Sequence, residues 1–139
     1  MIDITVYGTP APQGSKRYVG RGIMIESSKK VAPWREAVKW AALGMSGILS
    51  PERPLSLCVT FTVQKPKSAP KTRRTYPLRK PDLDKLIRST MDALTDAGVW
   101  EDDARVTLIT ARKCFPSEGP SALETPGARI TIEEGPLHA

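Results

Sequence analysis

The segment 82–96, DLDKLIRSTMDALTD, constrains the fold of this chain more than any other segment. Its apolar side chains recur every three or four residues and share one stripe of a helix, formed by Leu83, Leu86, Ile87, Thr90, Met91 and Leu94. Asp82 and Asp84 open the segment, where the helix dipole favours negative charge, and Gly98 supplies a stop. A helix with one apolar stripe must bury it, so we expect this helix to pack against a sheet.

The rest of the chain predicts that sheet and a second helix. Runs that are β-branched or alternate between apolar and polar residues predict strands at 2–7, 55–63, roughly 105–115 and 127–133. A helix is predicted over 33–46 because Pro33 suits a first helical position and is followed at helical spacing by Trp34, Val38, Ala41, Ala42 and Met45. We therefore expect a single α+β domain over 1–139, in which two helices pack on one face of a small mixed or antiparallel sheet of about four strands. Residues 134–139 are expected to form a frayed tail.

The charge balance of the chain points to an anionic partner. The formal net charge is +6 and the pI is about 9.5, which suits nucleic acid or an acidic membrane surface. No apolar run approaches the roughly 20 residues that span a bilayer. The start, MIDITVYGTPAP, lacks the basic and apolar regions of a signal peptide. We expect a cytoplasmic protein with no membrane partner.

Histidine and cysteine are too scarce for several classes of active site. The one histidine, His138, lies in the expected tail, which argues against Ser-His-Asp and Cys-His catalysis and against histidine-based metal sites. Cys58 and Cys114 lie in apolar stretches and are predicted to be buried free thiols. Carboxylates, lysines and arginines must therefore carry any chemistry.

A basic segment precedes the two aspartates of the helix. From Arg53 to Pro81 the chain contains no Asp or Glu, and the proline-rich stretch 65–81 predicts a mobile basic loop. A run of Lys and Arg is usually a solvated face, but this run leads directly into paired carboxylates, which favours nucleic-acid binding. A second basic cluster, with Lys16 and Arg17, lies in a glycine-flanked segment that is also predicted to be a loop.

Acidic residues bracket the predicted helix. Asp82 and Asp84 precede it, and Glu101, Asp102 and Asp103 follow it. Oxygen ligands of this kind suit Mg²⁺. A helix over 82–96 is roughly 22 Å long, so the two groups can share an ion only if the next strand runs back or a partner subunit supplies one group.

The same residues have simpler interpretations. Aspartates in a first helical turn often serve as caps or dipole partners. Asp84 and Arg88 have the i, i+4 spacing of a surface ion pair, and the acidic run 101–103 suits a solvated turn.

Three motifs taken together resemble the RusA family of crossover-junction endodeoxyribonucleases, particularly its phage-encoded members. The motifs are KPDLD at 80–84, MDAL at 91–94 and GVWEDD at 98–103. The N-terminal strand followed by GTPAPQGSKR also resembles the family, so the resemblance runs from end to end.

The resemblance implies a homodimeric α+β enzyme that binds four-way (Holliday) DNA junctions and nicks two strands symmetrically with Mg²⁺, or with Mn²⁺ as a substitute. For a phage-encoded protein it implies the host cytoplasm. The metal-binding aspartates of the family fall on Asp82, Asp84 and Asp103, with Asp102 as the candidate if the alignment shifts by one. A basic helical residue of the family falls on Arg88. The chain departs from the family in having Lys85 where Asn is usual and Arg88 where Lys is frequent.

Our hypothesis from the sequence is a junction-resolving nuclease. Asp82, Asp84 and Asp103 hold the metal, and Arg88 completes the catalytic set. The expected DNA-binding residues are Lys16, Arg17, Lys71, Arg73, Arg74, Arg79 and Lys80. One alternative is a non-catalytic, basic nucleic-acid-binding dimer. Another is a restriction-enzyme-like metal nuclease, but the acid-x-Lys pair that such a nuclease needs on a strand has no convincing match here.

Overall fold

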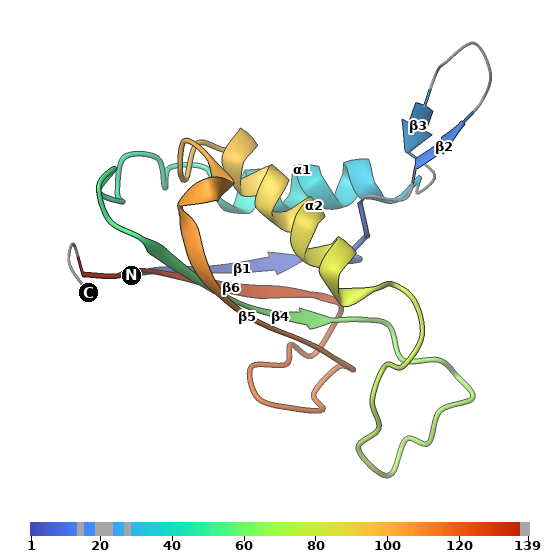
Figure 1. The fold of residues 1–139 in the computed structure, drawn as a ribbon. Coiled ribbons are helices and arrows are strands. Elements are labelled where there is room, and N and C mark those ends of the chain that lie inside the picture. Colours follow the sequence, from blue (N-terminus) through green and yellow to red (C-terminus); the bar gives the residue numbers. More distant parts are fainter. Residues whose placement is uncertain (14–15, 19–23, 27–28, 137–139) are drawn as a thin grey trace.

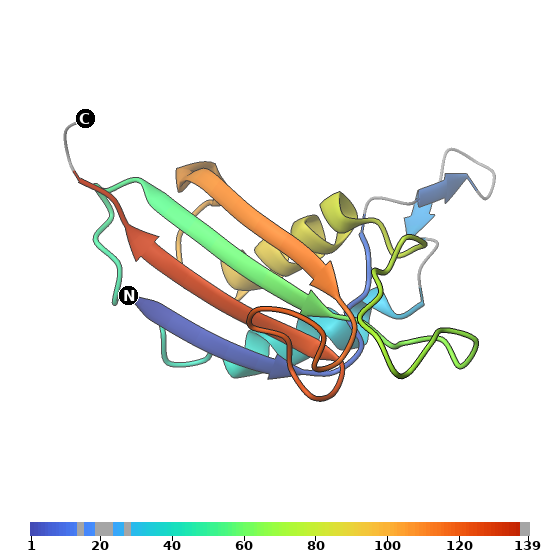
Figure 2. The same cartoon turned by 90° about the horizontal axis from the view of Figure 1, so that it is seen from below.

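Two helices cover one face of a four-stranded sheet in the computed structural model, which describes residues 1–13, 16–18, 24–26 and 29–136 (Figure 1). The sheet has the order β1-β6-β4-β5 and consists of β1 (Ile2–Tyr7), β6 (Gly127–Glu134), β4 (Leu55–Thr62) and β5 (Val106–Cys114). β6 pairs antiparallel with both β1 and β4, whereas β4 and β5 run parallel, so the sheet is mixed. Figure 2 shows the face that the helices leave uncovered.

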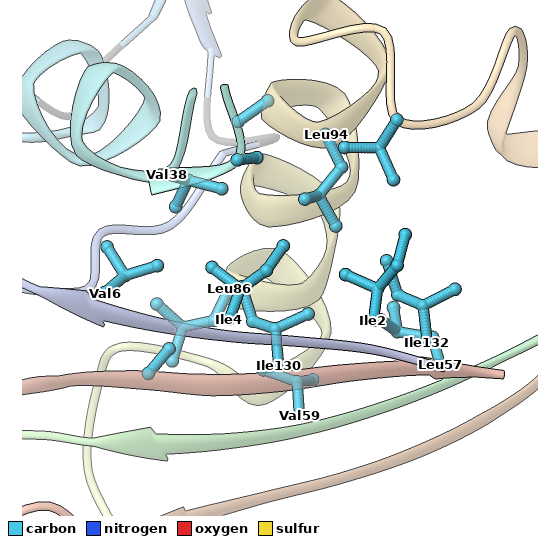
Figure 3. Packing of buried hydrophobic residues seen from close by; sticks show 14 of the residues in the cluster. Ile2, Ile4, Val6, Val38, Leu57, Val59, Leu86, Leu94, Ile130 and Ile132 are labelled. Atoms are coloured by element: carbon cyan, nitrogen blue, oxygen red, sulfur yellow. The ribbon is translucent and has the colours of Figure 1, made fainter. Parts of the chain in front are cut away.

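The core lies between this sheet and the helices α1 (Val31–Ala41) and α2 (Leu83–Asp96). β1 alternates buried and exposed residues along its whole length, as expected for a strand with one covered face. Buried side chains of the sheet meet Val38 of α1 and Leu86 and Leu94 of α2 (Figure 3). The sheet residues labelled there are Ile2, Ile4, Val6, Leu57, Val59, Ile130 and Ile132.

Polar contacts fix the helices and the segment after β1 relative to one another. The Trp34 indole Nε1 of α1 donates a hydrogen bond to Thr90 Oγ1 of α2 across 3.1 Å, and both residues are buried. Ser89 Oγ donates to Ala11 O at 2.6 Å, and Gln13 N donates to Lys85 O at 3.0 Å. The segment that ends in Gln13 therefore lies along α2.

The structure confirms the predicted α+β class and both helices on one face of a mixed sheet. α2 begins one residue after the predicted start, because Asp82 is its N-cap. Segment 65–81 contains no helix or strand, as its prolines predict. Among the described residues, no helix has the length and apolar content that crossing a membrane requires.

Several finer predictions are wrong. The basic segment around Lys16 is not simply a loop, because β2 (Lys16–Tyr18) pairs antiparallel with β3 (Met24–Glu26) in a separate two-stranded sheet. α1 runs from Val31 to Ala41 rather than over 33–46, so Pro33 is its third residue, where the missing N–H still costs no helical hydrogen bond.

Two further corrections concern Cys58 and the expected tail. Cys58 is exposed because its side chain projects to the uncovered sheet face, whereas Cys114 is a buried free thiol as predicted. β6 continues to Glu134, one residue into the range expected to fray, since Glu134 pairs with Leu55 of β4.

Candidate metal and nucleic-acid site

The first acidic group lies at the start of α2. Asp82 is the N-cap residue with an extended backbone, yet its side chain makes no capping hydrogen bond. Its Oδ2 is 3.6 Å from Lys85 Nζ, and both Asp82 and Asp84 are exposed. Capping therefore does not account for Asp82, and two carboxylates remain accessible at this helix end.

Arg88 lies one turn further along α2 and is also exposed. The suggested ion pair with Asp84 is absent, since no salt bridge among the described residues involves either side chain. The guanidinium of Arg88 is thus accessible on the same helix as the two carboxylates.

The second acidic group lies beyond the other end of α2, at η1 (Asp103–Arg105). A depression of about 330 Å³ there is lined by Arg35, Asp92, Thr95, Asp96, Glu101, Asp102 and Asp103. Asp102 accepts a hydrogen bond from Ala104 N at 2.9 Å and so caps η1. Desolvation raises the pKa of the Asp103 carboxyl, and a hydrogen bond with Asp102 and the charges of Asp102 and Asp92 raise it further.

Three of these carboxylates already have side-chain partners within the chain, and one of them is Glu101, which forms an ion pair with Arg105. Arg35 forms an ion pair with Asp96, and Gln13 Nε2 donates to Asp92 Oδ2 at 2.7 Å. Arg35 NH1 also donates to Gln13 Oε1 at 3.2 Å, which joins these groups in one network. In this depression, Asp103 is therefore the better candidate than Asp92 or Asp96 for binding an external cation.

The two acidic groups stand at opposite ends of α2 (Figure 1). α2 has 14 residues and is therefore about 21 Å long. Within the described part of the chain, no three acidic, cysteine or histidine side chains form a group that could hold a metal ion. The oxygen donors suit Mg²⁺ in kind, but one chain by itself does not bring Asp103 to Asp82 and Asp84.

The basic segment 65–81 leads into Asp82 and is held at its base by Glu118. Glu118 Oε2 is 2.5 Å from Lys65 Nζ, and Glu118 Oε1 accepts a hydrogen bond from Thr75 N at 2.8 Å. These hydrogen bonds, that of Lys65 first, lower the pKa of the Glu118 carboxyl. Two distant points of the segment are thereby joined through one carboxylate.

Lys113, near the end of β5, holds the last part of the same segment. Its Nζ donates hydrogen bonds to Arg79 O at 3.0 Å and to Pro81 O at 2.9 Å. The chain therefore enters α2 from a fixed position, and Asp82 follows directly. Lys113 thus holds the backbone that directly precedes the acidic residues at the start of the helix.

The predicted DNA-binding residues of the segment are exposed: Lys71, Arg73, Arg74, Arg79 and Lys80. Arg74 lies over the Tyr76 ring, with 4.9 Å between its Cζ and the ring centroid. The backbone of Lys16 and Arg17 forms part of β2, but their side chains lie outside the described part of the chain, as does His138.

Sequence reasoning missed the residues that organise this region. Lys113 and Glu118 act on partners more than 30 positions away, and nothing in their local sequence signals that role. Gln13 carried a weak signal, because it lies in the GTPAPQGSKR segment of the family resemblance, but its carboxylate partner could not be foreseen.

A comparison with known protein families covers most of the chain. A family model described as endodeoxyribonuclease RusA matches residues 7–133. The matched range includes both acidic groups, all of α2 and the whole basic segment. No curated protein matches the chain.

Proposed function

Since this chain belongs to the RusA family of endodeoxyribonucleases, we propose that it is a homodimeric, Mg²⁺-dependent enzyme that resolves four-way DNA junctions by paired symmetric nicks. The observation that carries the proposal is the family match over residues 7–133. Mn²⁺ can substitute for Mg²⁺ in this proposal, because it also accepts oxygen ligands. The protein would act in the cytoplasm, which is the host cytoplasm if a phage encodes it.

In this proposal the metal site is completed between two subunits. Asp82 and Asp84 of one protomer bind the ion together with Asp103 of the partner subunit. The separation of these residues by the length of α2 supports a composite site, because a single chain offers only part of the ligand set. When bound, the ion supplies Lewis-acid chemistry for phosphodiester hydrolysis. Arg88 and Lys80 would contribute positive charge to the phosphate.

The free edge of β5 suits the required dimer. β5 is an edge strand, and among the described strands only β4 pairs with it. Leu108 and Ile109, in the middle of β5, are 58% and 41% exposed. If β5 paired antiparallel with its own copy about a two-fold axis, the start of each strand would lie beside the end of the other.

Antiparallel pairing of the β5 strands would join the two acidic groups. β5 begins just after Asp103, and Lys113 near its end contacts the carbonyl of Pro81, which precedes Asp82. The start of β5 in one protomer would therefore approach the start of α2 in the other protomer. Two such sites would be related by the two-fold axis, which matches the near two-fold symmetry of a four-way junction.

The activity is tested by incubating the protein with a synthetic four-way junction and with a linear duplex, each in Mg²⁺ or in EDTA. Paired nicks that require Mg²⁺ and are confined to the junction are expected. Binding without cleavage would instead favour the non-catalytic alternative, and equal cleavage of the linear duplex would indicate a nuclease without junction selectivity.

The composite site is tested by mixing two inactive variants, Asp84→Asn and Asp103→Asn. In a mixed dimer, one site carries both substitutions and the other carries neither, so mixing restores cleavage at one strand per junction. If each site lay within one chain, every site would carry a substitution and the mixture would stay inactive. Asp84→Asn alone should still bind junctions, which separates loss of chemistry from loss of folding.

A further inference from the structure

A cavity of about 550 Å³ opens beside the start of α2. Segments that follow β1, β4 and β5, the residue before α1 and the end of the basic segment meet around it. Its volume falls within the range of roughly 300–1,000 Å³ that is typical of sites for small organic ligands. Lys80 and Pro81 line it, so the cavity reaches the residue that directly precedes Asp82.

The walls of the cavity are largely apolar. Ala11, Val63 and Phe115 are buried residues of the lining, whereas Tyr76 is 59% exposed and Leu78 is 88% exposed. Arg74 stacks over the Tyr76 ring at 4.9 Å and thereby orients it. An oriented, accessible aromatic ring in an apolar cavity suits a planar ligand that stacks on it.

The polar groups of the cavity suit a ligand that is also anionic. Lys30, Arg79 and Lys80 line it, and no acidic residue is among its described lining residues. Gln64 adds an amide group that can bond the edge of a base, and Thr75 also lines the cavity. Thr75 Oγ1 is also the one buried side-chain oxygen or nitrogen of the described residues without a hydrogen-bond partner. A planar base attached to a phosphate combines all of these properties.

We propose that this cavity receives one unpaired nucleobase from the branch point of the DNA. The base stacks on Tyr76, its edge faces Gln64, and its phosphate lies at Arg79 and Lys80. The inference rests on the proposed function, because a nucleotide held here lies next to the acidic residues at the start of α2. Capture of one base would fix which phosphate reaches those residues, so the cavity would select the position of the nick.

The test measures equilibrium binding to a set of four-way junctions in EDTA, where no cleavage occurs. Each junction carries one abasic nucleotide, and its position is moved stepwise around the branch point. For the wild-type protein, loss of the captured base is expected to weaken binding by about 5- to 150-fold at one position in each symmetric half. Tyr76→Ala should bind the intact junction at least as weakly as the wild type binds that abasic junction, because the substitution removes the ring from both sites of the dimer, and it should lose its dependence on the base. Tyr76→Phe should keep the dependence.

Tyr7→Ala is the matched control, because Tyr7 is also a tyrosine, is 67% exposed and does not line the cavity. It should bind every junction as the wild type does. The inference would be overturned if the wild type bound all the abasic junctions with the same affinity. It would also be overturned if Tyr76→Ala and Tyr7→Ala lost equal affinity for the intact junction. If the protein cuts junctions in Mg²⁺ but its affinity does not depend on the position of the abasic nucleotide, the proposed function stands and only the base site is contradicted. Base-dependent binding without cleavage would instead support the base site and contradict the proposed nuclease activity.

Discussion

At the scale of single residues, Lys113 is the side chain that fixes the entry to α2. Its Nζ contacts Arg79 O and Pro81 O, so Lys113→Met removes both hydrogen bonds and leaves the aliphatic stem in place. We expect the cleavage rate to fall at least tenfold, because the backbone that leads into Asp82 loses its fixed position, while junction affinity changes little. The free energy of unfolding should fall by about 1–2 kcal/mol. Single-turnover cleavage and denaturant unfolding measure these effects.

Arg112 provides the control for Lys113. It is the neighbouring residue on β5, is exposed, and projects to the opposite sheet face. Arg112→Met should leave the single-turnover rate unchanged. If both variants lost the same cleavage rate, the loss would come from reduced positive charge near β5 and not from the hydrogen bonds of Lys113.

Glu118 gives the basic segment a defined pH dependence. Its pKa is lowered from the ordinary value of 4.5, mainly by the hydrogen bond from Lys65, so its contribution to stability is present above pH 4.5. That contribution is lost as the pH falls through the lowered pKa of the folded state. The Thr75 N–H donates a hydrogen bond to Glu118 Oε1. We therefore expect the NMR chemical shift of the Thr75 amide proton to change with pH, with a midpoint below pH 4.5.

The Glu118→Gln variant should abolish this titration of the Thr75 amide while leaving the core folded. Glu124→Gln, at an exposed residue of the neighbouring loop, should leave the titration unchanged. If the Thr75 amide signal still titrated with the same midpoint in Glu118→Gln, another carboxylate would be responsible for the shift.

At the scale of elements, the contact between α1 and α2 depends on one buried hydrogen bond. Thr90→Val is nearly isosteric but leaves the Trp34 indole N–H without an acceptor, since Thr90 Oγ1 accepts from it at 3.1 Å. We expect the free energy of unfolding to fall by about 1–3 kcal/mol in denaturant titrations. Thr110→Val, at an exposed position of β5, should change it by no more than about 0.5 kcal/mol.

The sequence predicted those helices and strands in which apolar residues recur at a regular spacing. The apolar stripe of α2 and the strict alternation of β1 each arise within one segment, so both elements were located within a residue. β2 and β3 were missed because strands of three residues are too short to show alternation. α1 ends earlier than its apolar spacing suggests, and Ala42 to Met45 continue as a turn in which Gly44 has a φ of +88°.

The candidate site was predictable in its composition but not in its spatial arrangement. The three aspartates and the basic segment could be chosen from motifs alone, because their residue types and order are local features. The positions of Asp82 and Asp103 at opposite ends of α2 follow from helix length, which the sequence indicated. The parallel pairing of β4 and β5 and the long-range contacts of Lys113 and Glu118 depend on the whole fold, so no local pattern revealed them.

At the scale of the whole molecule, the free edge of β5 should control assembly. Replacing Leu108 and Ile109 by Lys places two charges on this edge and should oppose pairing with a second copy. We expect a folded monomer in sedimentation experiments and no cleavage of junctions, because each composite site would be incomplete. Thr5→Lys, on the opposite edge strand β1, should remain dimeric and active. A β5 variant that stays dimeric would place the dimer surface elsewhere.

The net charge of +6 predicts that junction binding weakens steeply with salt, and the basic segment should carry a definable share of that dependence. Lys71 and Arg73 are exposed, so the double change to alanine should reduce the slope of log K against log salt by up to about 2, through loss of two phosphate contacts. A second double variant, Lys39→Ala with Arg112→Ala, removes the same charge from α1 and the open sheet face. It should change the slope much less, because counterions are released only where phosphates are contacted. Equal slopes for the two variants would mean that overall charge attracts the DNA and that the segment before Asp82 makes no direct phosphate contacts.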